Sequence, residues 1–496
     1  MTERRAMGAG STLGPELEVA LAIPERGARR TRRDLYEQLR TAIRAGRLAP
    51  GLRMPASRAL AQRLGVSRNT ITAVYELLVS EGFLVTRPGS GAFVAEGPAR
   101  ETRAAPTVDM AGRVRSIPSQ WRLTAFDTAA RYRFLLGLPD LGAFPWDLWR
   151  KIANRTLRAY GRAPGRPASP QGVAALREAI AGHLSFVRGI ACRADEIVVT
   201  SGAQQAFDLL AKALVHRPGV VVAVEDPGYP PIRAAFAAAG ATVVEAPVDE
   251  EGIIVEALPA GAQVICVTPS HQFPLGVPMS PRRRQALLAF ARRSGAVVIE
   301  DDYDGEYRFD SRPLDALQTL DVSGQVIYVG TFSKSLFPDL RLGYVVSPEW
   351  AREPLLSARL VTGGPSTIAQ QTLAAFIAEG HLVRHVRRMR RIYAERREAL
   401  LEAACGDPDG AIEAFPSIAG LHLALRLNPK IDDRRLVRAA TRLGVGSYAL
   451  SEFSVHGNRQ NGVVLGYGAI AREDARAGAR ALVQAVELAA SGRFEA

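Results

Sequence analysis

The sequence predicts an N-terminal winged helix-turn-helix of α+β class, followed by an α/β domain with a mostly parallel sheet and a smaller α+β part. The chain has 496 residues, which is more than one typical core accommodates. Its first hundred residues show helical periodicity and then a hairpin pattern, whereas the rest alternates short apolar runs with helical segments. Hydrophobic content of 47% and charged content of 23% are those of an ordinary globular protein.

The N-terminal unit is predicted from its helix and turn signals. Residues 1–30 lack sustained periodicity and are expected to form a flexible arm. In residues 31–97, an apolar face beginning at Leu35 indicates a first helix, and Ser57 and Ser67 are expected to cap a second and a third. The following run FLVTRPGSGAFVA places two β-rich stretches around turn residues, which is typical of a hairpin. Three helices and a hairpin together predict a winged helix.

Residues 98–125 are polar and rich in arginine, and we expect them to be a linker. Residues 126–496 are predicted to form the second unit, with a large part at about 166–360 and a small part from 126–165 and 361–496. Its strand candidates are EIVVTSG, VVVAVEDPGY, ATVVEAPVD, QVICVTPS, AVVIEDDYD and QVIYVGTFSK. Strands that alternate with helices form a mostly parallel sheet, and ligands bind beyond the carboxyl ends of such strands.

The charge of the chain favours a polyanionic partner. The formal net charge is +13, and residues 1–100 hold 16 arginines against nine acidic residues, so over half of the excess lies in a fifth of the chain. A coding bias toward arginine is the alternative explanation, because the chain has only four lysines. Cys192, Cys266 and Cys405 are scattered and are interpreted as buried thiols of a reducing cytoplasm. No run approaches the length of a membrane span, so we expect a cytoplasmic protein without a membrane partner.

Lys334 directly follows the apolar run VIYVGTF, where such sheets bind ligands. A lysine at this position is either an ion-pair partner or a Schiff-base nucleophile. Pyridoxal phosphate requires the second, together with a phosphate cup and an acid that faces the ring nitrogen. An arginine cannot replace this lysine, because a guanidinium does not act as the amine of a Schiff base.

Further polar residues follow neighbouring strand candidates. TSGAQQ offers backbone amides at the start of a helix, and Thr331, Ser333 and Arg341 lie close to the lysine in sequence, so these groups are candidates for a phosphate cup. Asp301 in EDDYD has the acid for a pyridine nitrogen, and Tyr229 in EDPGY has a ring that can stack. Each motif alone is more typical of a cap or turn, but together at successive strand ends they favour a cofactor site.

These motifs, with TPSHQFPLG and GTFSKSLFPDLRLGY, resemble the MocR subfamily of GntR-type transcription regulators, in which a winged helix precedes a fold-type I aminotransferase-like domain that binds pyridoxal phosphate. The resemblance covers nearly the whole chain from about residue 34. It implies a Schiff base on Lys334, Asp301 at the pyridine nitrogen, Tyr303 at the ring oxygen and Tyr229 stacked on the ring. The residues that it implies around the phosphate are Gly202, Ala203, Gln204, Thr331, Ser333 and Arg341. It also places His271 and Gln272 in the loop at the other ring edge.

The sequence departs from related aminotransferases at the positions that bind substrate. Phe273 stands where those enzymes have an asparagine for the ring oxygen, and Val464 stands where they have an arginine for the substrate carboxylate. Pro231 replaces an arginine of the γ-aminobutyrate-sensing member of the subfamily. Arg233 and Arg459 are the neighbouring candidates to replace the missing cation. Loss of a bidentate carboxylate clamp argues against ordinary turnover of α-amino acids.

The start of the predicted third helix is the candidate base-reading element. The N-terminal turn of a recognition helix meets base edges in the major groove, where arginine reads guanine and asparagine reads adenine. The candidate contacts are Ser67, Arg68, Asn69 and Thr70 in this turn, Arg58 at a phosphate, and Arg87 with Gly89 in a wing at the minor groove. The alternative is a helix cap with solvated arginines.

His381 and His385 have the helical spacing of zinc ligands but no nearby carboxylate, so they are interpreted as a solvated helix face and no metal site is expected.

The leading hypothesis is a regulator that binds double-stranded operator DNA at the nucleoid and senses a small amine or amino-acid effector through pyridoxal phosphate. The resemblance also implies a head-to-tail homodimer. Two alternatives stay open: an active aminotransferase with an accessory DNA-binding domain, and a regulator that senses pyridoxal phosphate itself. Under the leading hypothesis, physiological turnover is absent and at most a vestigial transamination half-reaction remains.

Overall fold

The computed structural model describes residues 28–96, 130–162, 169–309, 315–405, 411–455 and 460–491. The chain divides into two compact units, Met1–Arg115 and Ser116–Ala496, and each is described by itself. The division falls inside the segment predicted as a linker, all of which lies outside the described residues. The first described helix begins at Ala28, three residues before the predicted start of the winged helix.

The N-terminal unit has three helices and a hairpin in its described part. Ser67 caps the third helix, since its hydroxyl accepts a hydrogen bond of 3.1 Å from the Thr70 amide. The predicted cap at Ser57 is wrong, because Ala56 has the extended backbone of an N-cap and Ser57 is already helical. The elements are α1 (Ala28–Arg44), α2 (Ser57–Leu64), α3 (Arg68–Ser80), β1 (Leu84–Arg87) and β2 (Gly91–Val94).

This unit encloses its own apolar core. Leu35 and Leu39 of α1 pack with Ile71 and Val74 of α3, and all four are buried. The hairpin closes on this core, with Leu84 paired to Val94. Because the apolar residues are buried in this core, the arginines and the start of α3 remain on the surface.

The large part of the second unit is built on one sheet. Its order in the described residues is β4-β11-β10-β9-β8-β5-β6-β7. All six predicted strands are present and parallel to one another, whereas β11 and β7 run antiparallel and were not predicted. The bounds are β4 (Ile197–Thr200), β5 (Val221–Asp226), β6 (Thr242–Asp249), β7 (Gly252–Ile253), β8 (Val264–Val267), β9 (Val297–Asp302), β10 (Val326–Thr331) and β11 (Gly343–Val346).

Helices cover both faces of this sheet, as the alternation of strand and helix predicts. Val222 and Val224 of β5 pack into one apolar cluster with α6, α7 and α10, whereas Ala223 packs into another with α8. The helices of this part are α5 (Ala174–Arg188), α6 (Ala203–Leu214), α7 (Pro230–Ala238), α8 (Pro281–Ser294), α9 (Leu317–Leu320), α10 (Glu349–Thr362) and α11 (Thr367–Ala378).

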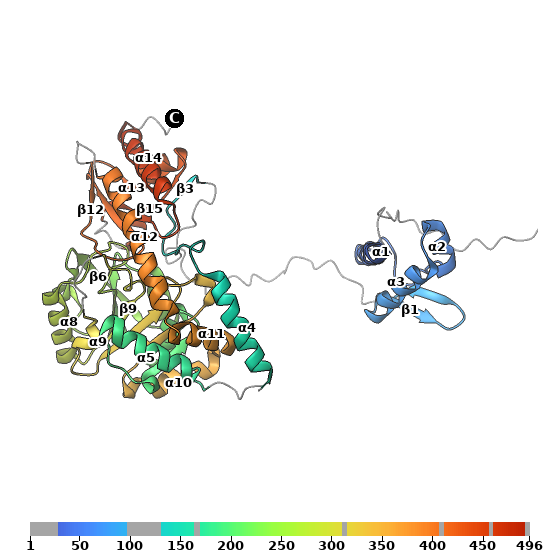
Figure 1. The fold of residues 1–496 in the computed structure, drawn as a ribbon, viewed down its shortest axis with the longest axis horizontal. Helices are drawn as coiled ribbons and strands as arrows, with labels where there is room; N and C mark the ends of the chain where they lie inside the picture. The colour runs from blue at the N-terminus through green and yellow to red at the C-terminus, as the bar shows by residue number, and fades with distance from the viewer. Residues whose placement is uncertain are drawn as a thin grey trace, which may run out of the picture. The chain divides into compact units, whose positions relative to one another are not determined.

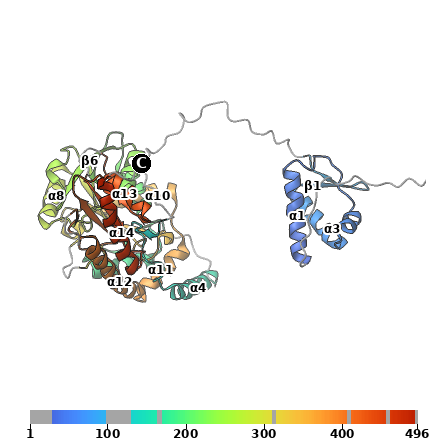
Figure 2. The same cartoon turned by 90° about the horizontal axis from the view of Figure 1, so that it is seen from above.

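The small part combines helices with an antiparallel sheet of order β12-β13-β16-β15. Helix α4 lies apart from the rest, against α11 of the large part, whereas the other elements gather at one end of the unit and α12 runs from there toward the large part (Figure 1). Helices α12, α13 and α14 lie together in the turned view (Figure 2). The bounds are α4 (Trp146–Arg162), α12 (His381–Ala404), α13 (Asp433–Arg442), α14 (Arg472–Ser491), β3 (Tyr132–Arg133), β12 (Ile412–Ala414), β13 (His422–Leu427), β14 (Val445–Gly446), β15 (Tyr448–Ala449) and β16 (Gly462–Gly466).

Strand β3 pairs in parallel with β14, so the segment that follows the predicted linker joins the C-terminal part of the chain. In the part of the chain that the structure describes, no helix is both long and apolar enough to cross a membrane. The three cysteines are free, and only Cys266 is fully buried. Cys405 is exposed, which corrects the expectation of a buried thiol, because it follows the last residue of α12.

Candidate functional site

The parallel strands bring the predicted polar residues to one edge of the large sheet. Strand β9 ends at Asp302, β10 ends at Thr331, and β5 ends at Asp226. Because these strands run in the same direction, Asp301, Lys334 and the loops after β5 and β8 meet beyond their carboxyl ends. Sequence order alone does not give this proximity, since the segments are tens of residues apart.

Lys334 lies in a confined position at this edge. Its Nζ donates a hydrogen bond of 2.8 Å to the Gly137 carbonyl. Gly137 has a φ of 64°, and a Cβ there would lie 2.4 Å from Nζ, so only glycine allows this approach. Burial lowers the pKa of the lysine, although Asp304 and Asp301 oppose that shift. A lysine with a lowered pKa is more readily the neutral amine that forms a Schiff base.

Asp301 is a buried carboxylate without a full set of partners. It is 4% exposed, and its Oδ1 has no hydrogen-bond partner among the described residues. Burial raises its pKa well above the ordinary value, and neighbouring Asp302 and Asp304 raise it further. An unpaired buried carboxylate oxygen is costly unless the group is protonated, so this atom is suited to accept a hydrogen bond from a cationic N–H donor on a ligand. A protonated pyridine nitrogen is such a donor.

Asp302, the next residue, has a different role. Its carboxylate lies 2.7 Å from Arg188 Nε and accepts a 2.6 Å hydrogen bond from the Tyr328 hydroxyl. Successive residues of a strand point to opposite faces, so one aspartate faces the ligand edge while the other is paired inside the fold through its Oδ2. The Oδ1 of Asp302, like that of Asp301, has no hydrogen-bond partner among the described residues.

The predicted phosphate cup forms at the start of α6. Gly202 is the N-cap of this helix, with a φ of 79°, and a Cβ there would lie 3.8 Å from Arg341 Cζ. Arg341 itself has a φ of 50° and is the one non-glycine residue with positive φ in the described ranges. A helix N-terminus and a guanidinium together favour an anion. Ala203 opens the helix beside them.

The other residues predicted for the phosphate cup lie nearby and form hydrogen bonds with neighbouring residues. Thr331 Oγ1 lies 3.2 Å from Ser333 Oγ, and the Ser333 amide donates to Thr331 Oγ1. Gln204 is exposed, and its side-chain amide donates to the Pro231 carbonyl at 3.4 Å.

Two tyrosines line the same edge. Tyr229 meets Phe273 edge to face at 5.3 Å, and burial raises its pKa to about 12. The Tyr303 hydroxyl donates to the His271 carbonyl at 2.9 Å and lies 3.1 Å from His271 Nδ1. His271 in turn pairs with Asp304 at 3.1 Å.

The Gln272 side chain stabilises the loop in which it lies. Its Nε2 donates to the Pro227 and Phe273 carbonyls, and its Oε1 accepts from the Leu275 amide. A third contact, 3.3 Å long, reaches Glu225. The structure therefore places this side chain in the scaffold of the loop, with no donor left over for a ring edge.

His422 is a residue that the sequence analysis missed. Its ring lies 4.5 Å from that of His271, and these two histidines and Asp304 have ligand atoms within 4.8 Å of one another. The composition suits a divalent cation, but both His271 nitrogens already have polar neighbours within 3.4 Å. Strand β13 is far from His271 in the sequence. The one sequence signal for His422 was its spacing of two from Ala424, which places both side chains on the same face of the strand.

The interpretation of His385 as part of a solvated face is wrong. His385 is buried against Phe144, with ring centroids 5.5 Å apart, and burial lowers its pKa to about 4. The apolar stripe of α12 includes Leu382, Val386 and Met389, so position 385 falls on the core side of the helix.

Arg233 does not replace the missing arginine that binds the substrate carboxylate in related aminotransferases. It is buried, and its guanidinium lies 3.5 Å from Asp226 and 3.4 Å from Glu245. Because both carboxylates pair with it, this arginine has a structural role. Arg459, the other candidate, lies outside the described residues. Val464 packs in an apolar cluster with Phe273 and Phe453.

The candidate nucleic-acid interface lies on the surface of the N-terminal unit. Arg68 and Asn69 are exposed at the first turn of α3, and Arg58 is exposed on α2. The Ser67 and Thr70 hydroxyls bond each other at 2.8 Å, so they hold the helix start. Arg87 stacks on Phe93 at 4.7 Å beside Gly89 in the exposed tip of the hairpin.

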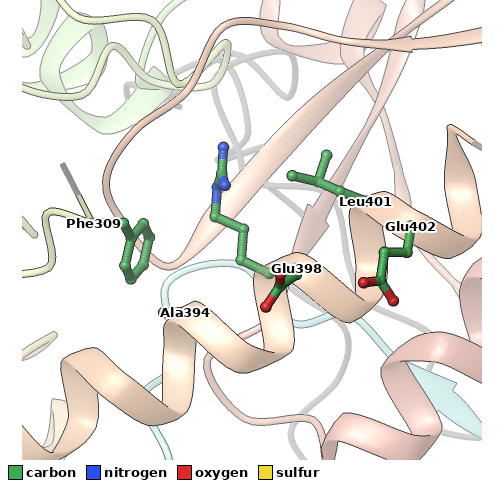
Figure 3. Close-up of a pocket in the computed structure, with 6 residues that line it drawn as sticks. Phe309, Ala394, Glu398, Leu401 and Glu402 are labelled. Carbon is green, nitrogen blue, oxygen red and sulfur yellow. The ribbon is translucent and has the colours of Figure 1, made fainter.

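A cavity of 340 Å³ lies elsewhere, on the outer side of α12 (Figure 3). Figure 3 shows Phe309 facing this helix, with Glu398 and Glu402 projecting from it. Arg397 holds the Ser417 carbonyl and lies 5.8 Å from the Phe309 ring. The residues that line this cavity include no lysine, so it is not the cofactor site.

The winged helix and the strand-end lysine site define the chain as a DNA-binding module joined to an aminotransferase-like domain. A model of bacterial regulatory proteins of the gntR family matches residues 31–94, and a model of class I and II aminotransferases matches residues 149–457. The chain is 37% identical over 463 residues to the probable rhizopine catabolism regulatory protein MocR of Rhizobium meliloti, covering 91% of this chain and 92% of that protein. The chain belongs to the MocR subfamily of GntR-type transcription regulators.

Two further similarities agree with this assignment. The pyridoxine biosynthesis regulator PdxR of Corynebacterium glutamicum is 34% identical, over 88% of this chain and 91% of its own. The kynurenine aminotransferase of Pyrococcus horikoshii superposes with a TM-score of 0.67 at 28% identity, over 74% of this chain and 93% of its own. The aminotransferase-like domain binds pyridoxal phosphate. The unpaired Asp301 oxygen and the Gly202–Arg341 cradle fit that cofactor.

Proposed function

We propose that this regulator binds operator DNA through α3 and the wing, and that an amine effector at Lys334 controls this binding. The observation that carries the proposal is the pair formed by Lys334, whose pKa is lowered, and Asp301, whose Oδ1 has no partner among the described residues. Pyridoxal phosphate supplies an aldehyde that exchanges one amine for another. Covalent exchange provides the differential binding energy that a switch requires.

The roles of the residues follow from their positions. Lys334 would hold the cofactor covalently, Asp301 would accept from its ring nitrogen, and Tyr229 would lie against the ring. Arg341 and the amides at Gly202 and Ala203 would neutralise its phosphate. Tyr303, oriented by His271, would face the ring oxygen. We also propose that the protein acts in the cytoplasm as a head-to-tail homodimer.

The first experiment measures the visible absorbance of the bound cofactor in the purified full chain. Lys334→Ala is expected to abolish that absorbance, whereas Lys212→Ala should leave it unchanged. Lys212 is a matched control, since it is exposed and paired with Asp208 on α6. A wild-type protein without any cofactor absorbance would contradict the cofactor site.

The second experiment titrates amines into the holoprotein, with and without promoter DNA. We expect spectral change and altered DNA affinity for the same amines, because coupling between two sites is reciprocal. Rapid multiple-turnover formation of a carbonyl product would favour the aminotransferase. DNA binding that follows cofactor occupancy but ignores all amines would favour a regulator of pyridoxal phosphate itself.

A further inference from the structure

The first half of α12 presents a basic stripe on its solvent side. The core side of the helix includes Leu382, Val386 and Met389, and all three are buried. The opposite side is exposed, and arginines recur on it at intervals of three, one and three residues, which places them on one helical face. The residues of this basic stripe are Arg384, Arg387, Arg388 and Arg391.

No acidic side chain among the described residues pairs with the basic stripe. Arg384 donates to the Glu379 carbonyl at 2.9 Å and lies 2.6 Å from His381 Nδ1, and neither atom belongs to an anion. The other three arginines have no hydrogen bond or ion pair with a described residue. The four guanidinium charges therefore face water or an external anion.

The stability of the helix does not explain this arrangement. The helix macrodipole favours acidic residues in the first turn and basic residues in the last turn, and α12 has neither. Its outer side is basic as far as Arg391 and then carries glutamates at 395, 398 and 402, of which Figure 3 shows Glu398 and Glu402. Arginines three and four residues apart also repel one another. A coding bias toward arginine would not separate the two signs along one face.

Helix α4 carries a second basic stripe beside the start of α12. Helix α11 packs against both of these helices. Arg155 of α4 pairs with Glu379, and the Glu379 carboxylate also lies 3.2 Å from His381 at the start of α12. The exposed cations of α4 are spaced by four, three and four residues, at Lys151, Arg155, Arg158 and Arg162. The basic surface therefore extends over two helices.

Duplex DNA suits this surface better than a membrane does. A helix that lies on a membrane needs an exposed apolar face next to its basic face, whereas the apolar face of α12 is buried in the core. From Arg384 to Arg391 the basic stripe is about 10 Å long, at about 1.5 Å per residue. Phosphates recur about every 3.4 Å along one strand of DNA, so the stripe matches about three of them.

We propose that the basic stripe of α12, continued by that of α4, binds the phosphate backbone of DNA that flanks the operator. This inference rests on the proposed operator binding by the winged helix and adds a second contact to it. Phosphate contacts carry no sequence information, but they add affinity that depends strongly on salt. Because both units belong to one chain, the second contact becomes intramolecular once the winged helix is bound.

The experiment compares two duplexes, each bound by the full-length holoprotein. The short duplex contains only a site selected on the wild-type protein, and the long duplex adds about 20 base pairs of unrelated sequence, or two helical turns, on each side. Fluorescence anisotropy at several salt concentrations gives the affinities. We expect about tenfold tighter binding of the long duplex, and a dependence of log affinity on log salt that is steeper by about three.

Two results of this comparison have different meanings. Equal affinities and equal salt dependence for the two duplexes would overturn the inference while leaving operator binding intact. Failure to bind either duplex would contradict the proposed operator binding itself.

A variant of the basic stripe identifies the residues responsible. It combines Arg384→Gln, Arg387→Gln, Arg388→Gln and Arg391→Gln. We expect it to lose the gain from the flanks and to keep the wild-type affinity for the short duplex. The matched control removes the same charge from exposed arginines of α8 and α14, through Arg292→Gln, Arg293→Gln, Arg472→Gln and Arg480→Gln. A flank gain that persists in the stripe variant, or that the control loses equally, would overturn the inference.

Two further measurements separate DNA binding from a structural or a membrane role. The stripe variant should keep its cofactor absorbance and melt at the same or a higher temperature, because repulsion along the helix is removed. A lower melting temperature would make the arginines structural and contradict the inference. Wild-type binding to phosphatidylserine vesicles that the stripe variant loses, without any gain from DNA flanks, would assign the surface to a membrane instead.

Discussion

The two units place their functional groups in opposite environments. In the winged helix, Arg68 and Asn69 are exposed at one helix start, and neighbouring residues in sequence are neighbours in space. In the aminotransferase-like unit, Lys334 and Asp301 are withdrawn from water and come from different strands. The first arrangement costs the fold little, since surface arginines stay solvated. The second holds a buried carboxyl group with one oxygen unpaired among the described residues, which a donor on a ligand would satisfy.

The largest expected effect tests the contrast between two adjacent aspartates. Asp302→Ala would leave Arg188 buried without its 2.7 Å partner, and we expect the free energy of unfolding to fall by about 3–5 kcal/mol. Asp301→Asn removes a carboxylate that has an unpaired oxygen, so stability should be unchanged or higher while cofactor affinity falls. Urea unfolding of the cofactor-free variants measures both. Equal destabilisation by the two substitutions would show that Asp301 is also a structural group.

The sequence predicts most of this site because its motifs are local. TSGAQQ, EDPGY and EDDYD each follow a strand, so the rule for parallel sheets places Asp301 and Tyr229 at one edge. His422 escaped prediction because its partner His271 is 151 positions away, and pairing across the two parts depends on how the small sheet packs. Arg233 was misjudged for a related reason: nothing near it in sequence reveals Glu245 as its second partner.

The next effect concerns the exposed unit, where function and stability should separate. Arg68→Ala is expected to weaken binding to a duplex selected on the wild-type protein by about 1–3 kcal/mol, because one base-reading contact is lost. The stability of the unit should not change, since Arg68 is exposed. Fluorescence anisotropy measures the affinity, and Arg44→Ala on α1 is the control. Unchanged affinity would show that the Arg68 side chain is solvated and does not contact the DNA.

A pH effect is expected from the buried histidine of α12. The pKa of His385 falls from 6.5 to about 4 on folding, so below pH 6.5 the unfolded chain binds a proton that the folded chain does not. Stability is therefore lost as the pH decreases, by about 2 kcal/mol between pH 6.5 and 5 from this group. His385→Phe should remove that part of the slope in urea unfolding, whereas exposed His216→Phe should not. An unaltered slope in His385→Phe would mean that the ring is protonated in the folded protein.

The smallest expected effect tests whether the start of α3 has a structural role apart from DNA. The Ser67 hydroxyl accepts from the Thr70 amide and bonds the Thr70 hydroxyl, so Ser67→Ala removes the cap of the helix. We expect a cost of about 1 kcal/mol, seen as roughly fivefold faster hydrogen exchange in the first turn of α3. Ser80→Ala, at the other end of the helix, is the control, because among the described residues its hydroxyl bonds only the Leu77 carbonyl. If Ser67→Ala left hydrogen exchange unchanged but weakened DNA binding, the main role of Ser67 would be to contact DNA. At this residue the exposed surface would then not separate a DNA-binding role from a structural one.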